Sequence, residues 1–233
     1  MKLCYLLPGS GLALAERQRR EGILNAVAAP GTKVEVHQVV DGPKSIESAV
    51  DEYKAMPLVL DFVMRNQANF DGFIVGCAGD SGLDGAREQS RKPVVGPGES
   101  SILLGTLGDR TFSCVTTSAE RARVKRRLVR EAGLDQNRLV SSHTLDLPVL
   151  QMGKDPLATQ RGLIKAMTKA KAEGAEVMLI GCMSTAFLEP PLLAEAEDQT
   201  GLKLVNPIVT AVKMAEALVA IDNYGRQSAA KAA

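Results

Sequence analysis

The chain has 233 residues, 45% of them hydrophobic and 24% charged, and at roughly 150 residues per domain this length predicts one compact unit or two small lobes. The formal net charge is +1 and only 3% of the residues are aromatic, so neither a nucleic acid nor a membrane surface is expected as a partner. No apolar run reaches the roughly 20 residues of a membrane span, and the opening apolar stretch is too short for a secretory signal, which predicts a cytoplasmic protein.

Short apolar runs alternate along the chain with longer segments of helical period. This alternation is typical of an α/β fold, in which a mostly parallel sheet is covered by helices on both faces. The expected strands, in chain order, are residues 3–7, 33–39, 72–75, 93–95, 111–115, 138–140, 177–180 and 203–205. Helices are expected between them.

Glycine and proline mark the limits of several expected helices. Gly133 follows a helix expected over residues 119–132. Pro57 is expected to break or kink a helical segment over residues 45–69. The helix over 119–132 carries six basic side chains, which we interpret as a solvated face. They are Arg121, Arg123, Lys125, Arg126, Arg127 and Arg130.

Four cysteines and two histidines are the residues best suited to metal binding or nucleophilic chemistry. The cysteines are expected to be thiols, and no two of them have the Cys-x-x-Cys spacing of zinc sites. Cys4 and Cys114 lie inside expected strands and are interpreted as packing residues. His37 and His143 lack neighbouring ligands, so we assign them structural or surface roles and expect no metal site.

The other two cysteines end two similar segments of the chain. In each segment a buried strand runs directly into Gly-Cys, at Cys77 and at Cys182. A strand that ends in a small polar turn precedes each cysteine at a similar distance, since Ser10 comes 67 residues before Cys77 and Thr116 comes 66 residues before Cys182. This repetition predicts two similar half-domains that face each other, with both cysteines in one cleft at the carboxyl ends of their strands.

The repetition also predicts where the chain divides. The first α/β lobe is expected over residues 1–108 and the second over residues 109–206. The helix over residues 207–224 is expected to cross back and pack on the first lobe. Each lobe is expected to be a small parallel-sheet unit of the flavodoxin-like kind, with the active site between the two.

Two thiols on opposite faces of one carbon can invert a stereocentre without a cofactor. The thiol pKa lies near about 8.5 and shifts with its surroundings, so one cysteine can remove a proton while the other returns one to the opposite face. We therefore expect Cys77 and Cys182 to act as an acid/base pair on a small-molecule substrate. As the proton leaves, charge moves onto a neighbouring oxygen, which needs hydrogen-bond donors.

The expected donors are backbone N–H groups after each cysteine and hydroxyl groups on the facing turns. The residues concerned are Ala78, Gly79, Asp80, Ser81, Met183 and Ser184, with Ser10, Thr116 and Thr117 opposite them. Asp80 has three readings: it caps a helix that begins near Gly82, holds an ammonium group, or raises the pKa of Cys77 by charge repulsion. We favour the cap.

At these positions the chain resembles the cofactor-independent aspartate/glutamate/hydantoin racemase superfamily, over nearly its whole length. The resemblance rests on residues 76–88, 93–99, 115–117, 146–149, 181–183 and 211–218. It implies two α/β lobes with the active site between them, no cofactor, and usually a homo-oligomer. It also implies that Cys77 and Cys182 are the catalytic bases. The residues that it places around the ligand are Gly79, Asp80, Ser81, Thr116, Thr117, Met183 and Ser184.

Two departures from the family pattern concern the substrate. The turn Pro8-Gly9-Ser10 stands where members commonly have Pro-Asn-Thr, and polar residues follow Met183 where small apolar ones are frequent. A ring such as a 5-substituted hydantoin or allantoin is the leading substrate, because its acidic C5–H suits thiol bases and its neutral carbonyls suit backbone donors. An amino-acid racemase of the aspartate/glutamate type is the alternative, and Asp80 is then the only obvious partner for the ammonium group.

Three further functions fit the sequence less well. A maleate-type cis-trans isomerase needs strong anchoring of carboxylates, and no Arg or Lys is close in sequence to either cysteine motif. A decarboxylase that works with a single cysteine has no use for the second one. A binding protein that closes on its ligand without chemistry does not need two symmetric thiols.

Overall fold

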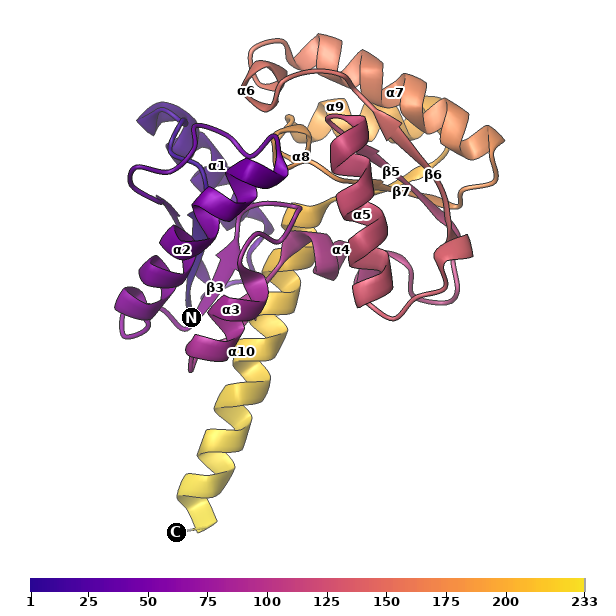
Figure 1. Cartoon of the computed structure of the whole chain (residues 1–233). Helices are drawn as coiled ribbons and strands as arrows, with labels where there is room; N and C mark the ends of the chain where they lie inside the picture. Colours follow the sequence, from indigo (N-terminus) through magenta and orange to yellow (C-terminus); the bar gives the residue numbers. More distant parts are fainter. Residues whose placement is uncertain (233) are drawn as a thin grey trace.

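The computed structural model describes residues 1–232, with side chains described to Tyr224, and it contains two four-stranded parallel sheets (Figure 1). The first sheet has the strand order β2-β1-β3-β4, and the second repeats this order as β6-β5-β7-β8. The strands are β1 (Lys2–Leu7), β2 (Lys33–Gln38), β3 (Gly72–Val75), β4 (Val94–Val95), β5 (Phe112–Thr116), β6 (Leu139–Thr144), β7 (Val177–Ile180) and β8 (Lys203–Val205).

Helices separate successive strands in both halves of the chain. The first half contains α1 (Leu14–Val27), α2 (Ala49–Asn66), α3 (Leu83–Gln89) and α4 (Pro97–Gly105). The second half contains α5 (Ala119–Glu131), the 3-10 turn η1 (Gln136–Arg138), α6 (Val149–Met152), α7 (Pro156–Ala172), α8 (Met183–Ala186) and α9 (Pro190–Thr200). α10 (Pro207–Ala232) ends the chain. The α/β class predicted from the alternation of short apolar and helical segments is confirmed.

The strands are continuous apolar runs because both faces of each sheet are buried. In β1, Leu3 and Tyr5 point to a core cluster shared with α1 and α10, whereas Cys4 and Leu6 point to a cluster shared with α2 and α3. Successive side chains of a strand point to opposite faces, so a strand covered on both sides has no polar positions to alternate with.

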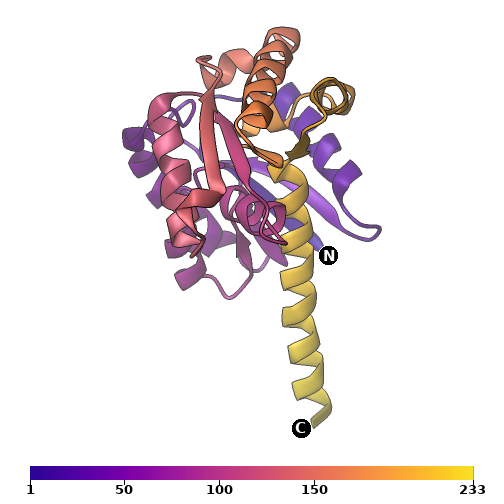
Figure 2. The same ribbon diagram turned by 90° about the vertical axis from the view of Figure 1, so that its right-hand side faces the viewer.

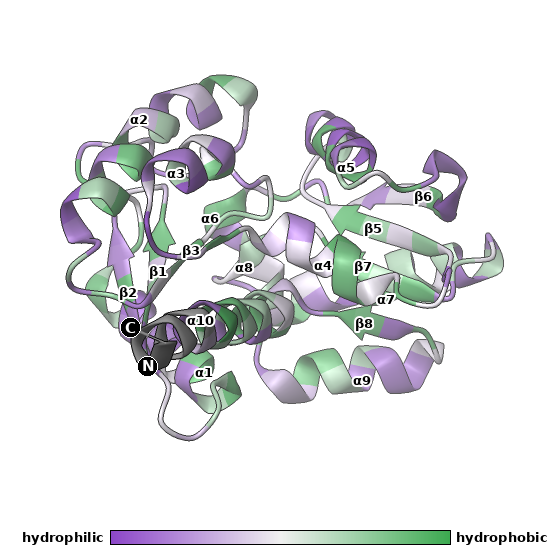
Figure 3. Ribbon diagram, turned by 90° about the horizontal axis from the view of Figure 1, so that it is seen from below, coloured by the Kyte–Doolittle hydropathy of each residue, from purple (hydrophilic) through white to green (hydrophobic). Residues whose placement is uncertain are grey.

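The second sheet is covered in the same way. In β7, Met178 packs in a cluster with α7 and α9, whereas Val177 and Leu179 pack in a cluster with α5. Seen from below, β5 and β7 are hydrophobic and lie between α5 and α9 (Figure 3). Within the described residues, the structure contains no helix with both the length and the hydrophobicity to cross a membrane.

β6 is longer than its sequence indicates. A strand was expected over residues 138–140, but β6 continues to Thr144 and pairs with β5 along most of its length. The added residues are the polar run Ser-Ser-His-Thr, which has no apolar signal. They lie in an edge strand, where Ser141 Oγ and Ser113 Oγ form a hydrogen bond of 2.7 Å. Backbone pairing with β5, and not burial of side chains, forms this strand, because its side chains are only partly buried.

α2 runs through Pro57, so the predicted break does not occur. The helix begins with a capping box, in which Ser48 accepts a hydrogen bond from the Asp51 N–H and the Asp51 carboxylate accepts one from the Ser48 N–H. Proline removes one helical hydrogen bond, here the one to the carbonyl of Tyr53. Tyr53 is an exposed residue on the outer side of the helix. Burial of the opposite side, which includes Val59, stabilises the helix by more than the proline costs.

α10 connects the two sheets. It begins at Pro207, directly after β8 of the second sheet, and packs against α4, β3 and α1. It ends at Ala232, beyond the predicted end at residue 224, and its final turns extend away from the body of the molecule (Figure 2). The division of the chain near residue 108 stays a prediction.

The packing of α10 predicts a large difference between two isoleucines on this helix. Ile208 is 1% exposed in the core, whereas Ile221 is 67% exposed. Ile208→Ala is expected to lower the free energy of unfolding by about 2–5 kcal/mol, through lost burial and a cavity. Ile221→Ala is the matched control and should change it by no more than about 0.5 kcal/mol. Urea unfolding measures both, and equal effects would show that α10 does not contribute to the core as described.

Candidate active site

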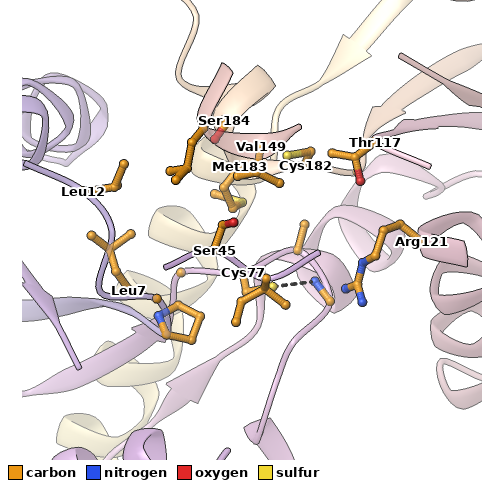
Figure 4. Close-up of a pocket in the computed structure, with 18 of the residues that line it drawn as sticks. Leu7, Leu12, Ser45, Cys77, Thr117, Arg121, Val149, Cys182, Met183 and Ser184 are labelled. Atoms are coloured by element: carbon orange, nitrogen blue, oxygen red, sulfur yellow. Dashed lines mark hydrogen bonds between the residues drawn. The ribbon is translucent and has the colours of Figure 1, made fainter. Parts of the chain in front are cut away.

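A pocket lies where the carboxyl ends of the two sheets face each other (Figure 4). Cys77 follows β3, Cys182 follows the corresponding strand β7, and both cysteines line the pocket. The turns after the neighbouring strands β1 and β5 contribute Gly9 and Thr117. Adjacent parallel strands end at the same edge of a sheet, and this is why these turns meet. The repeat seen in the sequence corresponds to a repeat in the structure.

Most residues predicted for the site line this pocket. Those that do are Cys77, Ala78, Gly79, Thr116, Thr117, Cys182, Met183 and Ser184. Ser10, Asp80 and Ser81 are not among its lining residues. The Ser10 hydroxyl donates to the Gly42 carbonyl at 2.7 Å, and the Ser10 N–H donates to the Pro43 carbonyl at 2.8 Å. The turn after β1 is thus bonded to a neighbouring loop, which takes this hydroxyl out of the pocket.

The other two cysteines and both histidines also lie outside the lining of the pocket. Cys4 is in β1 and Cys114 is in β5, with exposed fractions of 0% and 2%. Burial raises the pKa of the Cys114 thiol to about 11 and also raises that of Cys4. Both side chains are therefore protonated parts of the core at neutral pH.

Two donors point at the sulfur of Cys77. The Gly79 N–H donates to Sγ at 3.4 Å, and the Ser81 hydroxyl donates to it at 3.6 Å. Ser81 is 1% exposed, so it contacts the cysteine from the protein interior. These contacts orient the sulfur of a side chain that is itself half-buried.

Cys182 is more deeply buried. It is the N-cap of α8, and its side chain forms no cap hydrogen bond. Burial raises the pKa of the Cys182 thiol, and the backbone N–H groups of Ser184 and Thr185 nearby offset only part of that effect. Cys182 therefore holds its proton at neutral pH.

Asp80 caps a different helix from the predicted one. The expected helix is α3, but its N-cap is Gly82 and it has no side-chain cap. The Asp80 carboxylate instead accepts hydrogen bonds from the Gly98 N–H at 2.8 Å and the Glu99 N–H at 2.6 Å, at the start of α4. Local spacing favours a cap on the helix that follows, and the fold brings a second helix within reach of the same side chain.

This buried cap predicts an unusual dependence of stability on pH. Burial raises the pKa of Asp80 from 3.8 to about 6, although Lys125 and the two backbone donors favour the ionised form. Between these pKa values the folded protein binds more protons than the unfolded chain, so the stability that Asp80 contributes falls as the pH rises from about 4 to about 6. The free energy of unfolding of the wild type should therefore decrease relative to that of Asp80→Asn over this range, as measured by urea unfolding. A difference that is constant or grows with pH would contradict this.

Two basic residues of α5 are buried, which makes the predicted solvated face wrong at these positions. Arg121 is 6% exposed and Lys125 is 5% exposed. Arg121 Nη2 donates to Glu52 Oε1 at 2.6 Å, and Lys125 Nζ donates to the Ala78 carbonyl. Both partners belong to the first half of the chain: Glu52 lies on α2, and Ala78 lies in the loop after Cys77.

A signal for these two residues exists in the sequence. Arg121, Lys125 and Leu128 have the spacing of one helix face, and that face is buried. The apolar residues Ala122 and Val124 are only partly buried, so hydrophobicity alone does not mark this face. The partners of the two cations give no such signal, because they lie far away in the chain.

The pocket has an apolar side and a polar side. Figure 4 shows Leu7 and Leu12 on one side of the two cysteines, with Thr117 and Arg121 on the other. A substrate held between the sulfurs therefore meets aliphatic carbon in one direction and hydrogen-bond donors in the other.

Three cations line the pocket although none of them is close in sequence to either cysteine. They are Arg20, Lys44 and Arg121. Arg20 is 5% exposed and its Nε donates to Glu16 Oε1 at 2.8 Å, so two of the three cations are held in ion pairs. Among the described residues, none that lines the pocket carries a carboxylate.

Comparison with known proteins assigns the chain to a family. Residues 8–215 match the family Asp/Glu/Hydantoin racemase. The chain belongs to this family. It is therefore an isomerase of the racemase type, and the predicted resemblance is confirmed. A hydantoin racemase of Rhizobium meliloti is 34% identical to it over 94% of this chain and 89% of that protein.

Two solved structures have the same fold. An allantoin racemase from Klebsiella pneumoniae has a TM-score of 0.83 at 29% identity, and the match covers 95% of this chain and 89% of that one. An allantoin racemase from Pseudomonas fluorescens has a TM-score of 0.85 at 26% identity, and the match covers 95% and 92% of the two chains. The paired sheets of this chain are thus the fold of these racemases.

Proposed function

We propose that the chain racemises a 5-substituted hydantoin or allantoin with Cys77 and Cys182 as its two bases and with no cofactor. The observation that carries this proposal is the position of the two cysteines, which follow equivalent strands of two facing sheets and line one pocket. Relatives named hydantoin racemase and structural neighbours named allantoin racemase support the substrate class.

The reaction needs only proton transfers. One cysteine, as thiolate, removes the hydrogen from C5 of the ring, and the electrons of the C–H bond move toward the neighbouring C4 carbonyl oxygen. The other cysteine, as thiol, then gives its proton to the opposite face of C5, and the electrons return. Because its raised pKa keeps Cys182 protonated, we infer that Cys182 is the proton donor of the resting enzyme.

The lining of the pocket favours a neutral ring over an amino acid. An α-ammonium group needs a carboxylate partner, and Asp80 is bonded to α4 outside the pocket lining. The cations Arg20, Lys44 and Arg121 are the one observation that favours an aspartate/glutamate-type racemase, since they could hold carboxylates. Glu16 and Glu52 already neutralise two of these cations, so we keep the amino-acid racemase as the second candidate.

Proton NMR in deuterium oxide tests the proposal directly. A single enantiomer of 5-benzylhydantoin, 5-isopropylhydantoin or allantoin is incubated with the enzyme while C5–H intensity and optical rotation are followed. Loss of both signals above the buffer rate is expected for at least one of these rings. Activity with aspartate or glutamate and none with the rings would favour the second candidate. A chain that binds a ring without exchange would be a binding protein.

Three broader predictions remain proposals of the same kind. We propose a division into lobes near residue 108, a homo-oligomeric assembly and a cytoplasmic location. Sedimentation velocity tests the assembly, and fractionation of the source cells tests the location.

A further inference from the structure

The backbone donor two residues after Cys77 is directed at the sulfur. The Gly79 N–H donates to Cys77 Sγ at 3.4 Å. It is one of the N–H groups expected to bind the oxygen on which charge develops. Since it already has an acceptor, it is not free to bind that oxygen.

Arg121 has donors to spare on the polar side of the pocket. Its Nη2 is bonded to Glu52, while within the described part of the chain Nε and Nη1 have no hydrogen-bond partner. Neither of these two nitrogens is both fully buried and without a partner, so each retains some exposed surface. The side chain lines the pocket, so the pocket is where they can meet an acceptor.

The guanidinium shares the pocket with both cysteines. Burial lowers the pKa of Arg121, but the hydrogen bond with Glu52, the Glu52 charge and the two cysteines in their ionised form more than reverse this. Figure 4 shows Arg121 pointing toward the backbone nitrogen that is bonded to Cys77. A positive charge at this place favours any negative charge that forms between the two sulfurs.

Glu52 holds this guanidinium from the first half of the chain. It lies on α2 and is 3% exposed, whereas Arg121 comes from α5. A buried ion pair of this kind has one favourable geometry, because either group alone would be an unpaired buried charge. The pair therefore fixes the direction of the remaining donors.

We propose that Arg121 donates to the ring carbonyl oxygen beside the carbon that loses its proton, and that Glu52 is the positioning residue for Arg121. The ring edge then faces Arg121 and the 5-substituent faces the apolar side at Leu7 and Leu12 (Figure 4). This inference rests on the proposed racemisation of a hydantoin. Arg121 keeps its protons throughout: the C5–H electrons form a C4–C5 double bond, the carbonyl electrons move to oxygen, and both return when the second cysteine protonates C5.

Steady-state kinetics of Arg121→Met, Arg121→Lys and Glu52→Gln test this assignment. Arg121→Met should lower kcat about 100-fold, as expected for loss of an oxyanion donor, with a much smaller change in KM. Arg121→Lys should recover part of kcat because it retains the charge. Glu52→Gln should lower kcat by less than Arg121→Met. The matched control is Arg123→Met, which removes a charge from an exposed position of the same helix and should leave kcat unchanged.

Binding of 5,5-dimethylhydantoin separates catalysis from structure. This ring has no C5–H, so calorimetry reports ground-state binding alone. Arg121→Met is expected to bind it with an affinity within about 5-fold of wild type, because the bond to oxygen strengthens only as charge develops. Circular dichroism confirms that each variant is folded.

Several results would overturn the inference. They are a kcat of Arg121→Met within 3-fold of wild type, an equal loss in Arg123→Met, or a loss of ring binding as large as the loss of kcat. Failure of the proposed function looks different, because the wild type itself would then neither exchange C5–H nor bind the dimethyl ring, and the inference would fall with it.

Discussion

Replacing either pocket cysteine by serine is expected to stop racemisation while leaving hydrogen exchange at one face of the substrate. A hydroxyl is a far weaker acid than a thiol, so Cys77→Ser and Cys182→Ser should each lower kcat/KM for inversion by about 100- to 10,000-fold. The remaining cysteine, in the fraction of molecules in which it is ionised, can still remove the C5 hydrogen from the face that it contacts and return deuterium to that face. Each variant should therefore exchange one enantiomer with retention, and the two variants should exchange opposite enantiomers.

Proton NMR in deuterium oxide with separate enantiomers measures this asymmetry. Cys114→Ser is the matched control, because Cys114 is buried in β5 and does not line the pocket. Its activity per folded molecule should equal that of the wild type. Inversion by either pocket variant at more than a tenth of the wild-type rate, or exchange of the same enantiomer by both, would rule out one base on each face.

Adding a single methyl group at Gly79 is expected to lower kcat about 100-fold with little loss of stability. A Cβ at this position would overlap Arg121 Nη2 and Glu52 Oε1 and would lie 3.5 Å from Cys77 Sγ. The two overlapped atoms are the ends of long side chains, so they can move at small cost to folding. Their movement takes the guanidinium away from the reacting atoms, and displacements of about 1 Å can cost about 100-fold in rate.

Kinetics and thermal unfolding together test this prediction. Gly153→Ala is the matched control, because a Cβ at Gly153 meets nothing within 4 Å. It should leave both kcat and the melting temperature close to the wild-type values. A Gly79→Ala enzyme of full activity would show that the position of the Arg121–Glu52 pair is not critical, and a large drop in melting temperature would indicate that the loop cannot adjust.

Much of the fold could be predicted because its signals are local. β3, β7 and β8 coincide with the apolar runs read from the sequence, since a strand buried on both faces needs consecutive apolar residues. The length of β6 was underestimated, because an edge strand with partly buried side chains does not need a run of apolar residues. The repeated Gly-Cys ending is also a short-range pattern, and it allowed the similarity of the two sheets to be predicted.

The candidate site was predictable only in part, for a physical reason. Cys77 and Cys182 each end a strand, so their positions follow from the strands. Asp80 and Arg121 act on groups from other elements, and nothing in their neighbourhood along the chain indicates a cap on α4 or an ion pair with Glu52. Local hydrogen bonds leave short-range patterns, whereas pairing between elements depends on how the two sheets face each other.

The strands, the two-fold repetition and the pair of cysteines can be predicted without the structure, because each depends on residues close together in the chain. The packing of distant elements selects which polar groups face the substrate. It turned Ser10 toward a loop, placed Ser81 behind Cys77, and buried Arg121 in the wall of the pocket. Burying a charge is costly unless a partner is present, and the partner of Arg121 comes from α2, a helix that covers the other sheet. Only the packing of the two sheets brings that partner within reach.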